Sequence, residues 1–497
     1  MMFRASLLLV AGIVAASSGA QAPLTVDPAF RFYYTPALMD YWETTLAVGW
    51  QPAVSDILLR SNGQRLITGG NLNMPNEIPW GDNRSVLVNG EGSVEGYLNS
   101  LGGHVIEIPA TMQYFSGNHR LNYDCTPDHT FGWAGFAINN PSIPSWQIFE
   151  DRSGLVAGYF KIHDPDTVRY VLVKVDQWGQ WDSTYTPRRA AGGNLFGNTL
   201  FPLQNGQYIF NGSWTSYEGR PASAIIRIHP DGMQDTTFNS PSYSATVATM
   251  HEQADGKVVL GGQFRFYDYP DTVNLIRLNR DGSLDLSFNN FNTYRKEIPP
   301  PYNAMFAGIN VVAPLDETRY VVGGEFTLVD GEARGCIACV DTAGNLLDCW
   351  ADGGLVPSYY SPSGYPFVGL YGFKRLANGE TYIFGKYQGF IDANGLHPEQ
   401  VLISRLYMPN VGVDERPAIV EMLRVCPNPG TDRMQLSWAG KRIDAVLIRS
   451  TLGKVALETH MSGAPTVIDL SSLAPGMYTV EATSTDGVRS TVKWLKQ

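Results

Sequence analysis

The sequence predicts an all-β protein: a six-bladed β-propeller, with seven blades as the alternative, followed by a small Ig-like β-sandwich. The 497 residues are rich in Gly (51), Pro (31) and aromatic side chains (12%), and only 17% are charged. This composition is typical of β-rich proteins with many turns, and the length indicates more than one domain. A strand-and-turn pattern recurs six times, and residues 426–497 then follow a different pattern.

The chain begins with the layout of a secretory signal peptide over residues 1–20. Arg4 precedes a largely apolar run, Ala5–Ala16, which is too short to span a bilayer. Ser18 and Ala20 are small residues that suit cleavage after Ala20. An N-terminal helix packed in the core is the alternative. No later stretch approaches 18 apolar residues, so we expect an exported protein without a membrane span.

The internal repeat is the strongest pattern in the chain. Each copy has two segments, of which DGKVVLGGQF (255–264) and LIRLNRDGSLDLSF (275–288) are the clearest pair. The first segment ends in glycine in six copies, with spacings of 50–62 residues and one enlarged spacing of 88; these glycines are Gly70, Gly158, Gly212, Gly262, Gly324 and Gly385. Because four short strands cannot bury their own faces, the copies should stack radially as propeller blades over residues 21–408.

Turn chemistry defines the strands of each copy. Asn-Gly and Asp-Gly pairs supply the positive φ of tight hairpins, and the glycine ending the first segment lets neighbouring backbone approach closely. We interpret the aspartate after the second hairpin as a turn-capping acceptor, and the aromatic residue three positions later as a wedge between sheets. A ring of catalytic or calcium-binding aspartates is the alternative, which their spread over different repeats disfavours. These pairs are Asp182/Tyr185, Asp235/Phe238 and Asp285/Phe288.

The two ends of the repeat region predict how the ring closes. The sixth copy lacks its last strand, whereas Asp27 and Phe30 follow no hairpin. We therefore expect the N-terminal strand to complete the last blade. The first copy is irregular: Asp128 and Phe131 match its end best, and about residues 99–127 are then an insertion or part of a seventh blade. The repeat resembles the bacterial delta-60 repeat proteins, most closely at 277–288; the resemblance implies a β-propeller without an established activity.

After a linker at 409–425, residues 426–497 alternate short strands and turns, which predicts a small β-sandwich. Residues 424–497 carry nine basic and six acidic residues, against a net charge of −11 for the whole chain. The characteristic residues are Pro427, Asn428, Pro429, Gly453, Lys454, Asp469, Leu473, Gly476, Tyr478, Lys493 and Lys496. On these residues the stretch resembles the type A C-terminal sorting domain of the type IX secretion system of Bacteroidetes, although the family's Asp before Gly-Lys is replaced around Ser450.

The resemblance implies a transport signal handled by the type IX secretion machinery. It also implies a secreted, extracellular protein that is released or anchored at the outer-membrane surface. An ordinary Ig-like accessory domain is the alternative interpretation of the same residues.

Catalytic motifs are scarce. The chain has no G-x-S-x-G, no H-E-x-x-H and no phosphate- or dinucleotide-binding signature, so we name no catalytic residue and expect no cofactor and no metal. A group of possible ligands occurs in and after the irregular insertion, but a solvated loop is the simpler interpretation of it. The group is His119, Asp124, Asp128 and His129.

The five cysteines are few for an exported chain. Cys336 and Cys339 lie three apart in a predicted strand and should point to opposite faces. Cys349 lies across a predicted hairpin and could form a disulfide with one of them.

The connections of a propeller blade divide between two faces of the ring. The turns between first and second and between third and fourth strands are short here and lie on one face, the short-turn face. The longer connections lie on the opposite, long-loop face, and they are rich in aromatic residues that suit binding to a glycan or protein surface. The candidate binding residues are Tyr33, Tyr34, Trp42, Tyr267, Tyr269, Tyr294, Tyr302, Tyr359, Tyr360 and Tyr365.

We therefore expect a secreted or surface-attached, non-enzymatic binding or adhesion module. An extracellular polysaccharide hydrolase or lyase with a site at the propeller centre is the alternative, and a purely structural scaffold is a third. The net charge of −11 excludes nucleic acid as a plausible partner, because phosphate binding needs a basic surface. We expect an extracellular ligand whose identity the sequence does not give, either a glycan or a protein.

Overall fold

The computed structural model confirms the all-β class, since every element of the described residues is a strand. It describes residues 24–407 and 423–496 with interruptions. The interruptions of four or more residues are 33–51, 73–83, 100–103, 109–112, 133–136, 139–144, 162–169, 194–197, 268–271, 295–306, 361–365 and 461–465. The predicted signal peptide lies outside the described residues.

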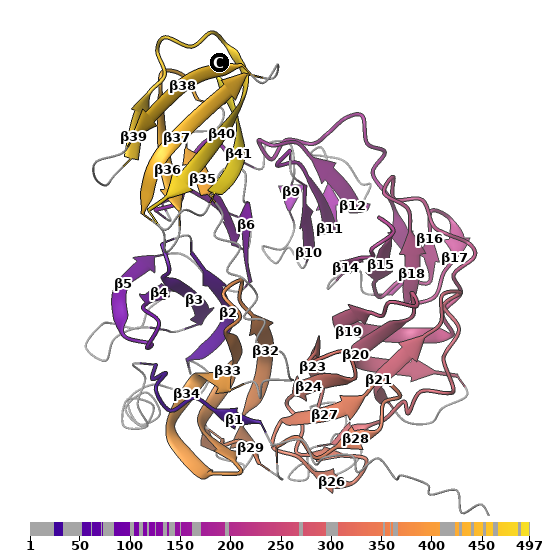
Figure 1. Ribbon diagram of the computed structural model, residues 1–497. Helices are drawn as coiled ribbons and strands as arrows, with labels where there is room; N and C mark the ends of the chain where they lie inside the picture. The colour runs from indigo at the N-terminus through magenta and orange to yellow at the C-terminus, as the bar shows by residue number, and fades with distance from the viewer. Residues whose placement is uncertain are drawn as a thin grey trace, which may run out of the picture.

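Seven sheets follow one another in a ring, and the first strand of each lies nearest the axis (Figure 1). We call them blades 1 to 7. Blade 1 contains β2 (Ala53–Leu59), β3 (Arg65–Gly70), β4 (Arg84–Val88) and β5 (Val94–Asn99); blade 2 contains β6 (Val105–Ile108), β7 (Gln113–Ser116) and β8 (His119–Leu121); and blade 3 contains β10 (Ser145–Ile148), β11 (Gly154–Lys161) and β12 (Tyr170–Val175). Blade 4 contains β14 (Thr199–Pro202), β15 (Tyr208–Asn211) and β18 (Ile225–Ile228), and blade 5 contains β19 (Ser242–Glu252), β20 (Val258–Phe266) and β21 (Val273–Leu278). Blade 6 contains β23 (Ile309–Pro314), β24 (Arg319–Gly324), β27 (Ile337–Asp341) and β28 (Leu346–Leu347), and blade 7 contains β32 (Gly369–Arg375), β33 (Thr381–Asp392), β34 (Gly395–Tyr407) and β1 (Thr25–Val26).

Blades 2 to 5 gain their fourth strand through single bridges, such as Leu278↔Leu284 in blade 5 and Leu121↔Pro127 in blade 2. Residues 105–127 therefore form a sheet of their own between β5 and β10, where the sequence suggests an insertion or part of a seventh blade. Within the described residues, seven sheets agree with the seven-blade alternative better than with six.

The repeated glycine faces a bulge in the innermost strand. The pairing of β19 with β20 shifts register between Val247 and Thr249, opposite Gly262. A Cβ on Gly262 would lie 2.0 Å from the Thr246 carbonyl oxygen, so only glycine fits there. In blade 1 the glycine in this place is Gly69, not the predicted Gly70: a Cβ would meet the Ala53 carbonyl oxygen at 1.9 Å on Gly69 and nothing within 4 Å on Gly70.

The N-terminal strand completes the last blade. β1 pairs with β34 through Thr25↔Tyr407 and Val26↔Leu406, and the Asp27 backbone N donates to the Arg405 carbonyl (2.7 Å). The ring is thus closed by residues from the two ends of the propeller sequence.

Small sheets tie the long connections together. In blade 4, the hairpin of β16 (Ser216–Tyr217) and β17 (Arg220–Pro221) pairs with β13 (Ala190–Ala191) of the connection entering that blade. In blade 6, β25 (Leu328–Val329) and β26 (Glu332–Ala333) pair in the same way with β22 (Thr293–Tyr294). The two kinds of long connection therefore share one face. The remaining small strands are β9 (Ala137–Ile138), β29 (Gly354–Leu355), β30 (Tyr359–Tyr360) and β31 (Pro366–Phe367).

A disulfide joins Cys339 to Cys349. It links β27 to the segment after β28, which agrees with the expectation that Cys349 reaches one member of the 336/339 pair. Cys336 is buried and is not part of this bond.

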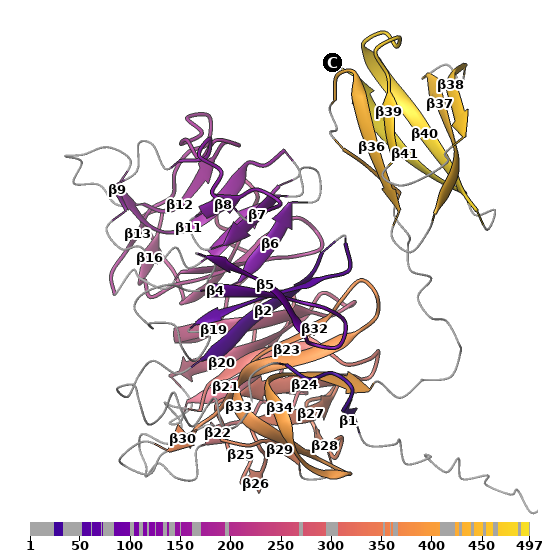
Figure 2. The ribbon, with the colours of Figure 1, turned by 90° about the vertical axis from the view of Figure 1, so that its left-hand side faces the viewer.

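The C-terminal strands form a separate two-sheet β-sandwich (Figure 2). Its core includes Trp494, Met434 and Val480, all fully buried. One sheet contains β35 (Leu423–Cys426), β36 (Arg433–Trp438) and β39 (Thr466–Asp469); the other contains β38 (Val455–His460), β37 (Ile443–Ser450), β40 (Gly476–Ser484) and β41 (Arg489–Lys496).

Candidate functional site

The repeated aspartate is the centre of a hydrogen-bonded corner. Asp285 Oδ1 accepts from the backbone N and the hydroxyl of Ser287 (2.9 and 2.6 Å). Its Oδ2 accepts from Arg277 Nε (2.8 Å) and Lys257 Nζ (2.7 Å). The Arg277 guanidinium lies 4.7 Å from the centroid of the Phe288 ring, a favourable cation–π arrangement. The same three residue types recur as Asp27–Arg405–Phe30, Asp128–Arg120–Phe131 and Asp235–Arg227–Phe238.

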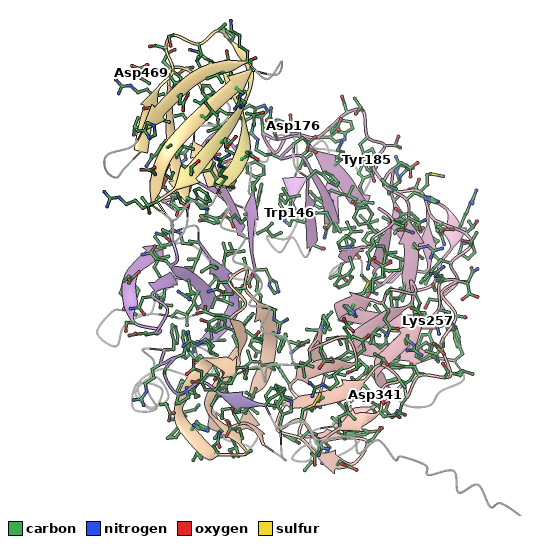
Figure 3. All side chains as sticks on the ribbon, viewed as in Figure 1. Trp146, Asp176, Tyr185, Lys257, Asp341 and Asp469 are labelled. Carbon is green, nitrogen blue, oxygen red and sulfur yellow. A yellow bond between two sulfur atoms is a disulfide. The ribbon has the colours of Figure 1, made fainter. Side chains whose placement is uncertain are left out.

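Each corner also holds the next blade. Arg277 Nη1 donates to the Thr342 carbonyl (2.7 Å), and the Asn289 backbone N donates to the Ala343 carbonyl (2.8 Å). Both acceptors belong to the third–fourth turn of blade 6, and Figure 3 shows Lys257 and Asp341 on these neighbouring blades. The corners therefore join successive blades on the short-turn face, in agreement with the interpretation of aspartate as cap and aromatic ring as wedge.

These carboxylates remain ionised at neutral pH. Burial alone would raise the pKa of Asp128, but hydrogen bonds from Thr130 and the Arg120 guanidinium outweigh it and lower the pKa to about 2. The pKa values of Asp235 and Asp285 are lowered further for the same kinds of reason. Such groups are suited to structural ion pairs rather than to proton transfer near neutral pH.

The basic member of the corner was missed in the sequence, although a signal for it exists. Within blades 2 to 5, a basic residue precedes the aspartate by eight positions. The pairs are Arg120/Asp128, Lys174/Asp182, Arg227/Asp235 and Arg277/Asp285.

A second charged group lies where three innermost strands meet. Asp56 of β2 accepts from Lys374 Nζ of β32 (2.7 Å) and from the Val105 backbone N of β6 (3.1 Å), and His104 Nδ1 lies 3.8 Å from its Oδ2. Burial raises the pKa of Asp56, but the nearby His104 and the Lys374 ammonium group outweigh it, so the net shift is downward. This group joins blade 7 to blades 1 and 2 near the axis.

The group of possible ligands after the irregular insertion is not gathered into one site. Asp128 belongs to the corner of blade 2, and Asp124 accepts from the backbone N and hydroxyl of Thr126 (3.0 and 2.7 Å). His129 is exposed, and His119 lies on β8. No cluster of metal-ligating side chains occurs among the residues the structure describes.

The predicted binding tyrosines have different surroundings. Tyr267 follows β20 and is 84% exposed, whereas Tyr294 is half-buried and its hydroxyl accepts from Asn292 Nδ2 (2.9 Å). Tyr359 and Tyr360 form β30, which pairs with β31. The other predicted residues lie outside the described residues; they are Tyr33, Tyr34, Trp42, Tyr269, Tyr302 and Tyr365.

Tyr243 is a further candidate that sequence reasoning missed. It lies on β19, is 44% exposed, and its ring centroid is 4.6 Å from that of Tyr267. Both residues lie at the end of the β19–β20 pair opposite the Asp255-Gly256 turn, on the long-loop face. The sequence places Tyr243 inside a strand segment, and only the pairing register reveals that it projects outward.

In the sandwich, several sorting-motif residues hold the fold together. Lys496 is buried and its Nζ donates to the Leu470 carbonyl (2.5 Å), while the Tyr478 hydroxyl donates to the Ala474 carbonyl (2.7 Å). Asp469, labelled in Figure 3, accepts from the Ser471 backbone N (2.9 Å). Leu473 packs against the core of the sandwich, and Lys454 is exposed. Gly476 is the first residue of β40, and Lys493 lies on β41. The remaining motif residues lie outside the described residues; they are Pro427, Asn428, Pro429 and Gly453.

Comparison with known proteins agrees with the division of the chain into a propeller and a C-terminal sandwich. Residues 203–238 and 253–288 match the family described as a domain of unknown function (DUF5122) beta-propeller, and residues 424–497 match the secretion system C-terminal sorting domain. No curated protein matches the chain significantly. The described part of the chain contains no helix that could span a membrane.

Similar solved structures include PorZ, a surface component of the type IX secretion system of Porphyromonas gingivalis. It is 13% identical with a TM-score of 0.34, and the match covers 91% of this chain and 61% of PorZ. The extracellular domain of the putative one-component system BT4673 from B. thetaiotaomicron is 10% identical with a TM-score of 0.21, over 89% and 79% of the two chains. The GH43 protein BlXynB from Bacillus licheniformis is 10% identical with a TM-score of 0.26, over 74% and 90%.

At these identities and TM-scores, nothing follows about activity. The C-terminal match, in contrast, indicates secretion with surface or outer-membrane attachment, as predicted from the motifs of the tail. The chain is a β-propeller protein that carries a type IX C-terminal sorting domain.

Proposed function

We propose that the propeller is a non-enzymatic binding and adhesion module whose long-loop face contacts an extracellular ligand. The observation that carries this proposal is Tyr267, an aromatic side chain 84% exposed at the long-loop end of blade 5. A tyrosine left in water offers a rigid surface with a polar tip, at a small cost in conformational entropy on binding.

The opposite face supports the same proposal. Its repeated carboxylates accept hydrogen bonds from arginine, lysine and hydroxyl groups, and its turns pack against the preceding corners. These groups are used in holding blades together. The long connections carry no repeated aspartate corner, and surface connections of this kind can vary with the ligand.

The test is capture without turnover. The mature chain is incubated with immobilised mucin and with immobilised neutral and acidic polysaccharides, and the release of reducing ends is measured in parallel. We expect retention on at least one surface without products, and weaker retention for Tyr267→Ala. Trp178→Ala is the matched control, because Trp178 is 43% exposed in a turn of the short-turn face. Steady product release, or retention that Trp178→Ala weakens and Tyr267→Ala does not, would contradict the proposal.

The second candidate is a polysaccharide hydrolase or lyase. The observation that favours it is the group of Asp56, Lys374 and His104 on or beside innermost strands, because central acid–base groups are what such an activity needs. Product release abolished by Lys374→Met, in a variant that still folds, would support this candidate.

A further inference from the structure

On the described part of the long-loop face, Tyr243 and Tyr267 form an exposed aromatic pair. Their ring centroids are 4.6 Å apart and their planes are inclined by 33°. They are 44% and 84% exposed. Two aromatic rings in contact with each other and open to solvent form a ready platform for a ligand.

A second bulge in β19 produces this pair. The bulge at Val247/Thr249 has counterparts in β2, β23 and β32 and belongs to the repeat. The bulge between Ser242 and Ser244 lies at the beginning of β19, and it leaves Tyr243 without a register partner, between the pairs Ser242↔Phe266 and Ser244↔Arg265. Bulges redirect side chains and are frequent next to binding sites.

The described, exposed neighbours of the pair along β19 and β20 are polar, and one of them is charged. Ser244 lies opposite Arg265 in the register, and both are exposed. Further along β19, Thr246 is exposed, while Ala245 and Val247 are buried against blade 4. The exposed hydroxyl groups of Ser244 and Thr246 therefore follow the tyrosine pair along β19, and the Arg265 guanidinium lies on the neighbouring strand β20.

We propose that Tyr243 and Tyr267 form a saccharide subsite that takes a pyranose ring of a neutral glycan chain. This inference rests on the proposed binding function and names its ligand class. The C–H face of a pyranose is apolar and packs on an aromatic ring, while its hydroxyl groups need hydrogen-bond partners at the edge. Ser244, Thr246 and Arg265 supply those partners.

A neutral glycan fits this surface better than an acidic ligand or a protein. Recognition of a polyanion uses several basic groups. In the part of the β19–β20 pair between the Gly262 bulge and the long-loop face, residues 242–247 and 262–266, Arg265 is the one basic side chain. A stable protein interface buries about 800 Å² per partner around an apolar centre. Among the described residues of β19 and β20, the exposed neighbours of the two rings are the polar side chains Ser244, Thr246 and Arg265.

Affinity electrophoresis of the mature full-length chain tests the proposal. The gels contain β-glucan, mannan, xylan or starch as neutral polysaccharides, and polygalacturonate as the acidic comparison. We expect at least one neutral polysaccharide to retard the chain, and Tyr243→Ala and Tyr267→Ala each to raise the apparent Kd by about tenfold. Tyr267→Phe keeps the ring and should retain most of the binding.

Leu286→Ala is the control, because Leu286 is 76% exposed in the same blade, beyond its third–fourth turn. It should leave retardation unchanged, and all variants should keep the thermal midpoint of the wild type. Retardation by polygalacturonate alone, or by no polysaccharide, would overturn the inference. Retardation that survives both alanine substitutions would also overturn it while leaving the proposed binding function intact, whereas product release would defeat the proposed function itself.

Discussion

Arg405 and Asp27 form an ion pair between residues 378 positions apart, with Nη2 and Oδ2 separated by 2.6 Å. Arg405 Nη1 also donates to the Gly90 carbonyl of blade 1 (2.7 Å). The pair therefore joins the N-terminal strand, the last blade and the first blade at one point. It is the corner of the repeat, assembled from both ends of the propeller.

Breaking this pair should open the ring. Asp27→Asn removes one of the two carboxylates that pair with Arg405 and leaves Glu380 Oε1 at 3.1 Å from Nη1, which should cost about 2 kcal/mol in the free energy of unfolding. Urea unfolding measures the loss, and limited proteolysis should release the N-terminal segment. Asp285→Asn is the matched control: it breaks the same corner within the chain and should lower stability without exposing the N-terminus. Equal protease resistance of the N-terminus in wild type and Asp27→Asn would contradict the assignment.

Acid should weaken the whole ring through the same corners. The pKa values of Asp27, Asp128, Asp235 and Asp285 are lower in the folded protein than the ordinary value of 3.8. A lowered folded-state pKa stabilises the fold above the unfolded value, and that stability is lost as the pH falls toward the folded value, about 2 for Asp128. Urea midpoints should be flat near neutrality and fall steeply below about pH 4. A smaller fall is expected for Asp285→Asn; an identical one would argue against the corners as the cause.

The glycine at the bulge should resist substitution. Gly262→Ala places a Cβ 2.0 Å from the Thr246 carbonyl oxygen, so the strand must shift at a cost of about 2–3 kcal/mol. Gly70→Ala has open space around its Cβ and should cost far less. Thermal unfolding of the two variants compares them directly, and a similar loss in both would mean that the close approach is unimportant.

The sorting domain should be needed for export and not for the propeller fold. A chain lacking residues 426–497 should accumulate in the periplasm with an unchanged thermal midpoint, because the sandwich has its own core. Cell fractionation locates the protein. Normal secretion of the shortened chain would contradict the role of this domain.

The sequence predicted the features that repeat and missed those that depend on pairing register. Aspartate, aromatic residue and glycine recur with fixed spacing, so the corner and the ring closure were predictable. Arg277 was visible in the motif, but its role emerges only when Asp285 and the blade 6 turn converge on it. Residues 105–127 lack the repeat's glycine pattern, so the sequence left open whether they are an insertion or part of a seventh blade.

The candidate binding tyrosines also show that the sequence pattern does not predict the pairing register. Tyr267 was found because it follows a repeat segment and lies in a long connection. Tyr243 looks like an ordinary strand residue, and a bulge that no local pattern encodes turns it outward. A one-residue change of register decides which side chains face solvent.

Hydrogen–deuterium exchange of the full chain with and without a retained polysaccharide tests the central claim most directly. If the long-loop face binds, amide protection should rise at 242–246 and 263–267 and stay unchanged at the short turns 253–257 and 279–283. Protection confined to those short turns, or no protection in the propeller at all, would contradict the account.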